Sequence, residues 1–270
     1  MARHSLKLHA QALIAAFQFL TRLPVPIQVP FEGAVLSRSV IYFPLAGAAI
    51  GMVTCAAAWL TGLVLPPLPG AVIVLAIWTA LSGGLHMDGW MDTADGVLSH
   101  RSRERMLEIM KDSRVGAMGV IAAVLLLLLK ASLLAELLQE ERQATALFML
   151  AATPGWGRAW MAAAIAIWPN ARQGEGLGAM FGGVRIEQAG CAFLLAAAAT
   201  FGLLTAAGLA FLFNAAAVAA AVSVTVLCGA FSAAWLNRKL GGLTGDTYGA
   251  MNEAVEAALL LVAVIWLHAA

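Results

Sequence analysis

Three aspartates stand close together in the stretch 83–96 (GGLHMDGWMDTADG), at the end of a long uncharged segment. Asp88, Asp92 and Asp95 are four and three residues apart, so on a helix they form one narrow stripe. Like charges on one stripe repel each other, and a membrane boundary adds the cost of losing water. A divalent cation removes this repulsion, and carboxylate oxygens suit Mg²⁺ or Mn²⁺. The spacing therefore predicts a site for a divalent cation, with a solvated acidic helix end as the alternative.

A second polar group, KDSR, opens the next apolar segment at residues 111–114. Lys111 and Arg114 are phosphate-binding side-chain types, and Arg in particular can clamp a phosphate with two hydrogen bonds. Asp112 between them offers a fourth carboxylate. The same residues are typical of the basic flank of a membrane span. Taken by itself, the group therefore leaves both interpretations open.

Two Gly-rich stretches, 172–183 (RQGEGLGAMFGG) and 241–253 (GGLTGDTYGAMNE), would let the backbone approach a ligand closely. We expect both to be loops, with Arg172, Thr244 and Asp246 as polar contacts. Neither stretch has the spacing of a dinucleotide or P-loop fingerprint. Aspartates, basic residues and Gly-rich loops together predict a site for a metal-bound phosphate or pyrophosphate. The reaction class that this favours is phosphoryl transfer, which depends on positioning and charge neutralisation.

The elements that must position these residues are membrane helices. Hydrophobic residues make up 61% of the 270 residues and charged residues 11%, against about 25% charged residues in soluble domains. The net charge of +1 gives no sign of a nucleic-acid partner. We expect a single domain over residues 1–270, an all-α polytopic transmembrane helix bundle. Its uncharged segments predict about seven spans, near residues 40–64, 71–90, 115–135, 143–168, 188–212, 215–236 and 254–270.

Residues 5–20 precede these spans and have the pattern of an amphipathic helix. We expect this helix to lie in the membrane interface, with a short first span as the alternative. Basic loops mark the cytoplasmic side of a membrane protein. Seven spans would place the basic loops 91–114, 169–187 and 237–253 inside and the acidic loop 136–142 outside. The polar chemistry would then collect on the cytoplasmic face.

These motifs resemble those of the cobalamin (5′-phosphate) synthase family, also called adenosylcobinamide-GDP ribazoletransferase. The resemblance runs along most of the chain. It rests on FLTRLPVP at 19–26, FPLAGAAIG at 43–51, GGLHMDGWMDTADG at 83–96, MKDSRVGAMG at 110–119, ARQGEGLGAMF at 171–181 and GGLTGDTYGA at 241–250. The aspartate-rich motif followed by the TGDxxGA motif is its specific part.

The resemblance implies an enzyme of the bacterial cytoplasmic (inner) membrane with its active site facing the cytoplasm. Such an enzyme joins adenosylcobinamide-GDP to α-ribazole or its 5′-phosphate and releases GMP, with Mg²⁺ as cofactor. Asp88, Asp92 and Asp95 would bind the metal, and Asp92 or Asp112 would take the proton of the attacking ribose hydroxyl. Lys111 and Arg114 would stabilise charge on the phosphates. The substrate-binding residues would be His86, Arg172, Thr244, Asp246 and Tyr248. For His86, which projects away from Asp88 on a helix, we expect hydrogen bonding or packing.

Two other functions would use similar residues. A CDP-alcohol phosphotransferase acting on lipids also carries aspartates on membrane helices, but its DGxxAR motif has no counterpart at the right place here. A cation-coupled transporter would need carboxylates at mid-depth, whereas the charges here gather at one face. The abundant Gly and Ala along several spans would permit close helix packing, within one chain or between copies in a homo-oligomer.

Overall fold

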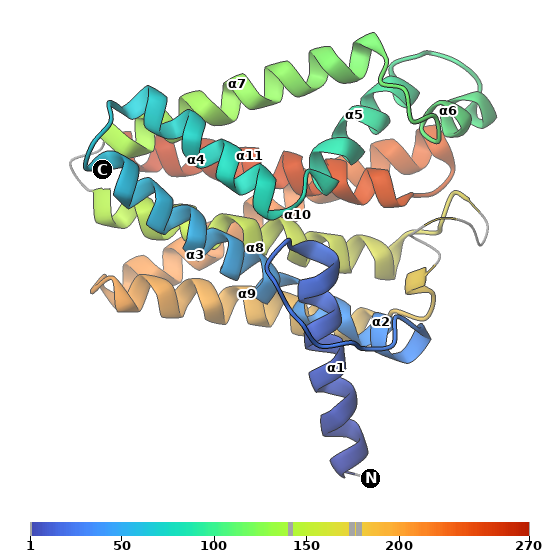
Figure 1. Ribbon diagram of the computed structural model, residues 1–270, viewed down its shortest axis with the longest axis horizontal. Helices are drawn as coiled ribbons and strands as arrows, with labels where there is room; N and C mark the ends of the chain where they lie inside the picture. Colours follow the sequence, from blue (N-terminus) through green and yellow to red (C-terminus); the bar gives the residue numbers. More distant parts are fainter. Residues whose placement is uncertain (1, 140–142, 173–175, 177–179, 270) are drawn as a thin grey trace.

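The computed structural model describes residues 2–139, 143–172, 176 and 180–269. In these residues eleven α-helices and the short 3₁₀ helix η1 (Val40–Tyr42) form a bundle, and the β-type pairing is confined to an isolated bridge between Asn170 and Leu243. Most of the long helices run side by side along the longest axis of the molecule (Figure 1). The prediction of an all-α polytopic membrane bundle is confirmed.

Five helical segments are long and apolar enough to cross a membrane. The first runs from Gly33 to Gly62 and joins α2 (Gly33–Ser39), η1 (Val40–Tyr42) and α3 (Phe43–Gly62). The others are α7 (Ala117–Gln139), α9 (Ile186–Ala206), α10 (Phe211–Leu240) and α11 (Gly245–Ala269). All five cover most of a predicted span, because uninterrupted apolar sequence is itself the signal for a membrane helix.

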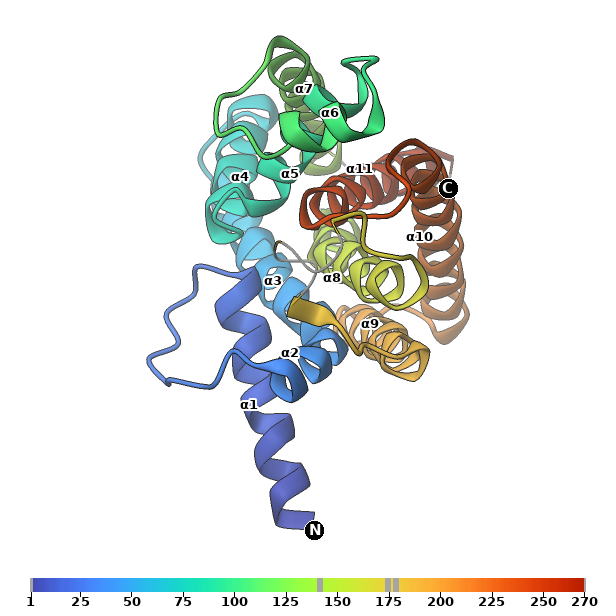
Figure 2. The same ribbon diagram turned by 90° about the vertical axis from the view of Figure 1, so that its right-hand side faces the viewer.

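The predicted span 143–168 forms a helix, α8 (Gln143–Ile167), but α8 is not among these five. Arg158, Pro154 and neighbouring glycines make its middle less apolar. The helix instead occupies the centre of the bundle, with α3, α9, α10 and α11 around it (Figure 2). Residues 151–164 are all buried. Protein therefore surrounds the polar groups of α8, which is how polar side chains and an interior Pro are tolerated at this depth.

The predicted span 71–90 is wrong as one continuous helix. It is divided between α4 (Pro67–Leu81) and α5 (Leu85–Val97), which meet at an angle of 91°. The two helices together count as a sixth, broken span or as a re-entrant segment. Gly83 and Gly84 form the break with φ angles of 65° and 71°, a conformation that favours glycine. The aspartate motif therefore lies on a separate short helix beyond the break.

Two further boundaries position the site. The stretch 241–253, expected to be a loop, becomes helical at Gly245 because Thr244 and Thr247 cap the start of α11 reciprocally. Thr244 N–H donates to Thr247 Oγ1 at 2.8 Å, and Thr247 N–H donates to Thr244 Oγ1 at 3.3 Å. At the other end of the chain, α1 (Ala2–Leu20) crosses the direction of the long helices (Figure 1). Its placement in the membrane interface stays a prediction.

Candidate functional site

The aspartate helix α5 packs closely against the first turns of α11. A Cβ atom added at Gly89 would lie 2.5 Å from the backbone oxygen of Asp246, and one at Gly249 would lie 3.2 Å from the Cα atom of His86. Only the absence of a side chain at Gly89 permits this approach. The crossing brings Asp246, more than a hundred residues further along the chain, next to the aspartate stripe.

The result is a cluster of carboxylates with one basic partner. Asp92 feels the negative charges of Asp88, Asp246 and Asp95 and the positive charge of Arg172. Arg172 Nη2 donates to Asp246 Oδ2 at 2.9 Å, so two residues predicted from separate Gly-rich stretches are joined by an ion pair. One guanidinium does not balance four carboxylates. The cluster therefore has an excess of negative charge that favours a bound cation.

Asp95 differs from the other members because both of its oxygens already accept hydrogen bonds. Gly116 N–H donates to Oδ2 and Gly119 N–H donates to Oδ1, each at 2.7 Å. These amides belong to the start of α7, where backbone N–H groups lack helical partners and the helix dipole favours an anion. Asp95 therefore joins α5 to the start of α7, whereas Asp246 accepts from Arg172 and Thr244 through its Oδ2 atom.

The donor set fits Mg²⁺ chemically. Within the described ranges, no three His, Cys, Asp or Glu side chains converge into a group that could by itself hold a metal ion. Mg²⁺ sites that act on phosphates commonly use one or two carboxylates and complete the shell with water and substrate oxygens. Asp88, Asp92 and Asp246 are hard oxygen donors of this kind, in surroundings that carry excess negative charge.

A cavity of about 90 Å³ adjoins the carboxylates. His86, Asp88, Asp246 and Tyr248 all line it, so three predicted substrate-binding residues and one predicted metal ligand share one space. Three phenylalanines that the sequence analysis did not select form another part of its wall: Phe19, Phe43 and Phe181. Their ring centroids lie 5.4 to 6.2 Å apart. The cavity therefore combines an acidic side with an aromatic side.

Thr244, which was predicted to bind substrate, holds the start of α11 and contacts Asp246. It is 1% exposed and caps α11, and its hydroxyl lies 3.4 Å from Asp246 Oδ2. The other Gly-rich stretch, 172–183, is described only in part, because residues 173–175 and 177–179 lie outside the described residues.

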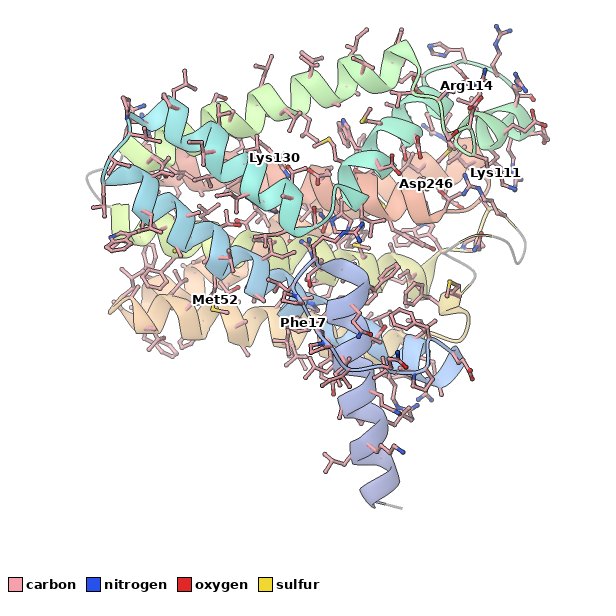
Figure 3. All side chains as sticks on the ribbon, in the orientation of Figure 1. Phe17, Met52, Lys111, Arg114, Lys130 and Asp246 are labelled. Atoms are coloured by element: carbon pink, nitrogen blue, oxygen red, sulfur yellow. The ribbon has the colours of Figure 1, made fainter. Side chains whose placement is uncertain are left out.

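The segment 111–114 lies toward the same end of the bundle as Asp246 but does not line the cavity (Figure 3). Arg114 binds Asp112 with two side-chain hydrogen bonds, Nε to Oδ1 at 3.0 Å and Nη2 to Oδ2 at 2.7 Å. These bonds lower the pKa of Asp112 to about 2. The carboxylate is therefore a weak proton acceptor, and the exposed Arg114 is paired with it.

Known proteins resemble this chain along most of its length. A family model described as cobalamin-5-phosphate synthase matches residues 12–264. The chain belongs to the cobalamin-5-phosphate synthase family. Among its relatives, a protein of Brevibacillus brevis is 38% identical, with 94% of this chain and 97% of the relative covered. One of Herpetosiphon aurantiacus is 42% identical, with 93% and 94% covered. Both are named adenosylcobinamide-GDP ribazoletransferase. No solved structure gives a significant match.

For this cobalamin-5-phosphate synthase family member, the sequence analysis missed a buried ion network behind the cavity. It joins Lys130 of α7, Arg158 of α8, and Glu253 and Glu256 of α11. Lys130 was predicted near the end of a span, and the two glutamates were not given a role. A signal was present, because ionisable residues inside apolar spans are costly unless they face the bundle interior and pair. Lys130, Arg158 and Glu256 lie within predicted spans and matched that description, and Glu253 directly precedes the last span.

Proposed function

We propose that this chain is a membrane transferase that joins adenosylcobinamide-GDP to α-ribazole or its 5′-phosphate, giving adenosylcobalamin or its 5′-phosphate and GMP. The observation that carries the proposal is the carboxylate cluster at the aromatic cavity. It occurs in a chain that aligns over nine-tenths of its length with relatives named for this reaction. This is the late assembly step of the nucleotide loop of cobalamin.

One or two of the carboxylates Asp88, Asp92 and Asp246 would hold Mg²⁺, and Asp95 would fix the helix that carries Asp88 and Asp92. When bound, the cation neutralises the pyrophosphate and the charge that develops during transfer. The ribose 3′-hydroxyl oxygen forms a bond to the phosphorus nearer cobinamide, and the bond from this phosphorus to the GMP oxygen breaks. Of the two candidate bases, Asp92 is the better one to take the hydroxyl proton, because hydrogen bonds from Arg114 lower the pKa of Asp112 to about 2.

Three basic residues would guide the phosphates. Arg172 stands beside Asp246 and is 12% exposed, so it is placed to contact a phosphate at the cavity. Lys111 and Arg114 lie at the same end of the bundle (Figure 3). Basic loops gather at this end, as expected for the cytoplasmic face of an inner-membrane protein. The substrates would then enter from the cytoplasm.

The test is turnover by purified protein in lipid, with adenosylcobinamide-GDP, α-ribazole 5′-phosphate and Mg²⁺. We expect equal amounts of GMP and cobalamin 5′-phosphate, and loss of both with EDTA. Asp88→Asn should lower the rate by about 100-fold, a typical effect of removing one electrostatic contact from a transition state. Glu187→Gln is the matched control, because this carboxylate is 71% exposed.

Normal turnover by Asp88→Asn would contradict the metal assignment. Absence of product from folded wild-type protein would contradict the reaction. In that case CDP-activated lipid precursors would test the lipid phosphotransferase alternative, and ion flux in proteoliposomes would test the transporter alternative.

A further inference from the structure

The interior of the bundle holds four charged side chains that the reaction above does not use. Lys130 Nζ lies 2.5 Å from Glu253 Oε2 and 2.8 Å from Glu256 Oε2, and Arg158 Nη1 lies 2.9 Å from Glu256 Oε1. The side chains of Lys130, Glu256 and Arg158 are at most 2% exposed. Two positive and two negative charges balance within the network. It therefore leaves no net charge to be offset by its surroundings.

The network reaches the cavity through His86. Asn252 Nδ2 lies 3.1 Å from His86 Nδ1 and also donates to Glu256 Oε1 at 2.9 Å. A carboxylate can only accept, so the Asn252 atom at Glu256 must be the amide nitrogen. The same nitrogen therefore presents its other hydrogen to His86. Arg158 Nη2, which has hydrogens but no lone pair to accept with, lies 3.4 Å from the same Nδ1.

Two donors at Nδ1 determine where the proton of the imidazole ring is. An imidazole nitrogen that accepts hydrogen bonds carries no hydrogen, so the ring proton must be on Nε2. His86 is 1% exposed, and its Nε2 atom is buried without a hydrogen-bond partner. A buried donor without a partner is costly. His86 also lines the cavity that Asp88 and Asp246 border.

We infer that His86 is an uncharged hydrogen-bond donor that binds a nucleoside part of the substrates through Nε2–H, and that the network of Lys130, Arg158, Asn252, Glu253 and Glu256 positions it. The inference rests on the proposed function. A nucleoside fits because the cavity presents three phenylalanines, on which an aromatic base can pack, beside one neutral donor for an acceptor atom of the base or ribose. Guanosine of the leaving group and α-ribazole of the acceptor both have this chemistry.

The first arm of the test is ¹⁵N NMR of histidine-labelled protein in nanodiscs without substrate. The His86 signals are assigned by their absence in His86→Gln. We expect a protonated Nε2 and an unprotonated Nδ1. GMP and α-ribazole are then added separately, and the one that shifts the Nε2 signal identifies the nucleoside. A protonated Nδ1, or no shift with either compound, would overturn the inference. These measurements need no turnover, so they are read independently of the proposed reaction.

The second arm compares two variants in the transfer assay. His86→Phe keeps a ring but has no donor, whereas His86→Gln can place an amide N–H near the position of Nε2. We expect His86→Phe to raise the KM for one substrate by about tenfold, the size of one uncharged hydrogen bond, with kcat changed less. His86→Gln should recover most of that loss. Equal KM values in wild type and His86→Phe would contradict the inference, as would equal losses in both variants.

Discussion

Lys130→Met tests the buried network most directly. The substitution keeps a long unbranched side chain, one atom shorter than that of lysine, but removes its charge. Lys130 is 2% exposed and pairs with two glutamates, at 2.5 and 2.8 Å. Arg158 remains for Glu256, whereas Glu253 loses its ion-pair partner. Removing one member of a buried ion pair leaves an uncompensated charge and costs about 3–5 kcal/mol.

In a chain of this size, 1 kcal/mol corresponds to a shift in thermal midpoint of about 2–4 °C. We therefore expect Lys130→Met to lower the midpoint by roughly 6–20 °C. The assay is thermal unfolding in one detergent at one scan rate. Lys239→Met is the matched control, because Lys239 is exposed at the end of α10 and its loss should shift the midpoint little.

The double variant Lys130→Met with Glu253→Gln makes the prediction specific to charge. It removes one charge of each sign and leaves the pair of Arg158 and Glu256, whose atoms lie 2.9 Å apart. We expect it to recover most of the lost stability. The reasoning is refuted if Lys130→Met unfolds at the same temperature as the control variant, or if the double variant is less stable than Lys130→Met.

Two further predictions concern the site. Gly89→Ala should separate α5 from α11, because the added Cβ would lie 2.5 Å from the backbone oxygen of Asp246. Transfer activity should fall by at least about tenfold, a sensitivity expected when catalytic groups are displaced by an ångström. Gly190→Ala, the control, adds a methyl group to open space and should keep its activity. Equal activities of the two variants would refute the close crossing. For Asp112, hydrogen bonds from Arg114 lower the pKa to about 2. A lowered pKa gives stability that is present above the unfolded value and is lost as the pH falls through about 2. Asp112→Asn should therefore change the thermal midpoint by the same amount at every pH between about 5 and 8, and a difference that varies with pH in this window would show that Asp112 titrates there.

Much of the site could be predicted from local sequence. The spacing of Asp88, Asp92 and Asp95 identified the helical stripe, and the Gly-rich stretches supplied Arg172 and Asp246, which the structure joins by an ion pair. Chain order could not show which helices cross. The contact of Gly89 with Asp246 depends on a tertiary approach, and so does the use of Asp95 at the start of α7.

The errors in the fold have the same origin. Apolar composition predicted most of the long helices, but it could not show that α8 lies enclosed at the centre of the bundle (Figure 2). The division at Gly83 and Gly84 was missed because two glycines within an apolar run are compatible with a continuous helix. Their positive φ angles exist only in the folded arrangement. The network around Lys130 likewise becomes visible only when α7, α8 and α11 are placed together.

The separation of its members along the chain gives this network a consequence for biosynthesis. Lys130 is made 123 residues before Glu253, so its helix is synthesised well before its anionic partners exist. A lone lysine at the centre of a span costs about 2.5–3.5 kcal/mol on insertion. Trp78, made earlier still, places its ring 4.8 Å from Lys130 Nζ and offers an interim contact. Insertion of α11, which carries Glu253 and Glu256, would then complete the charge balance and stabilise the assembled bundle.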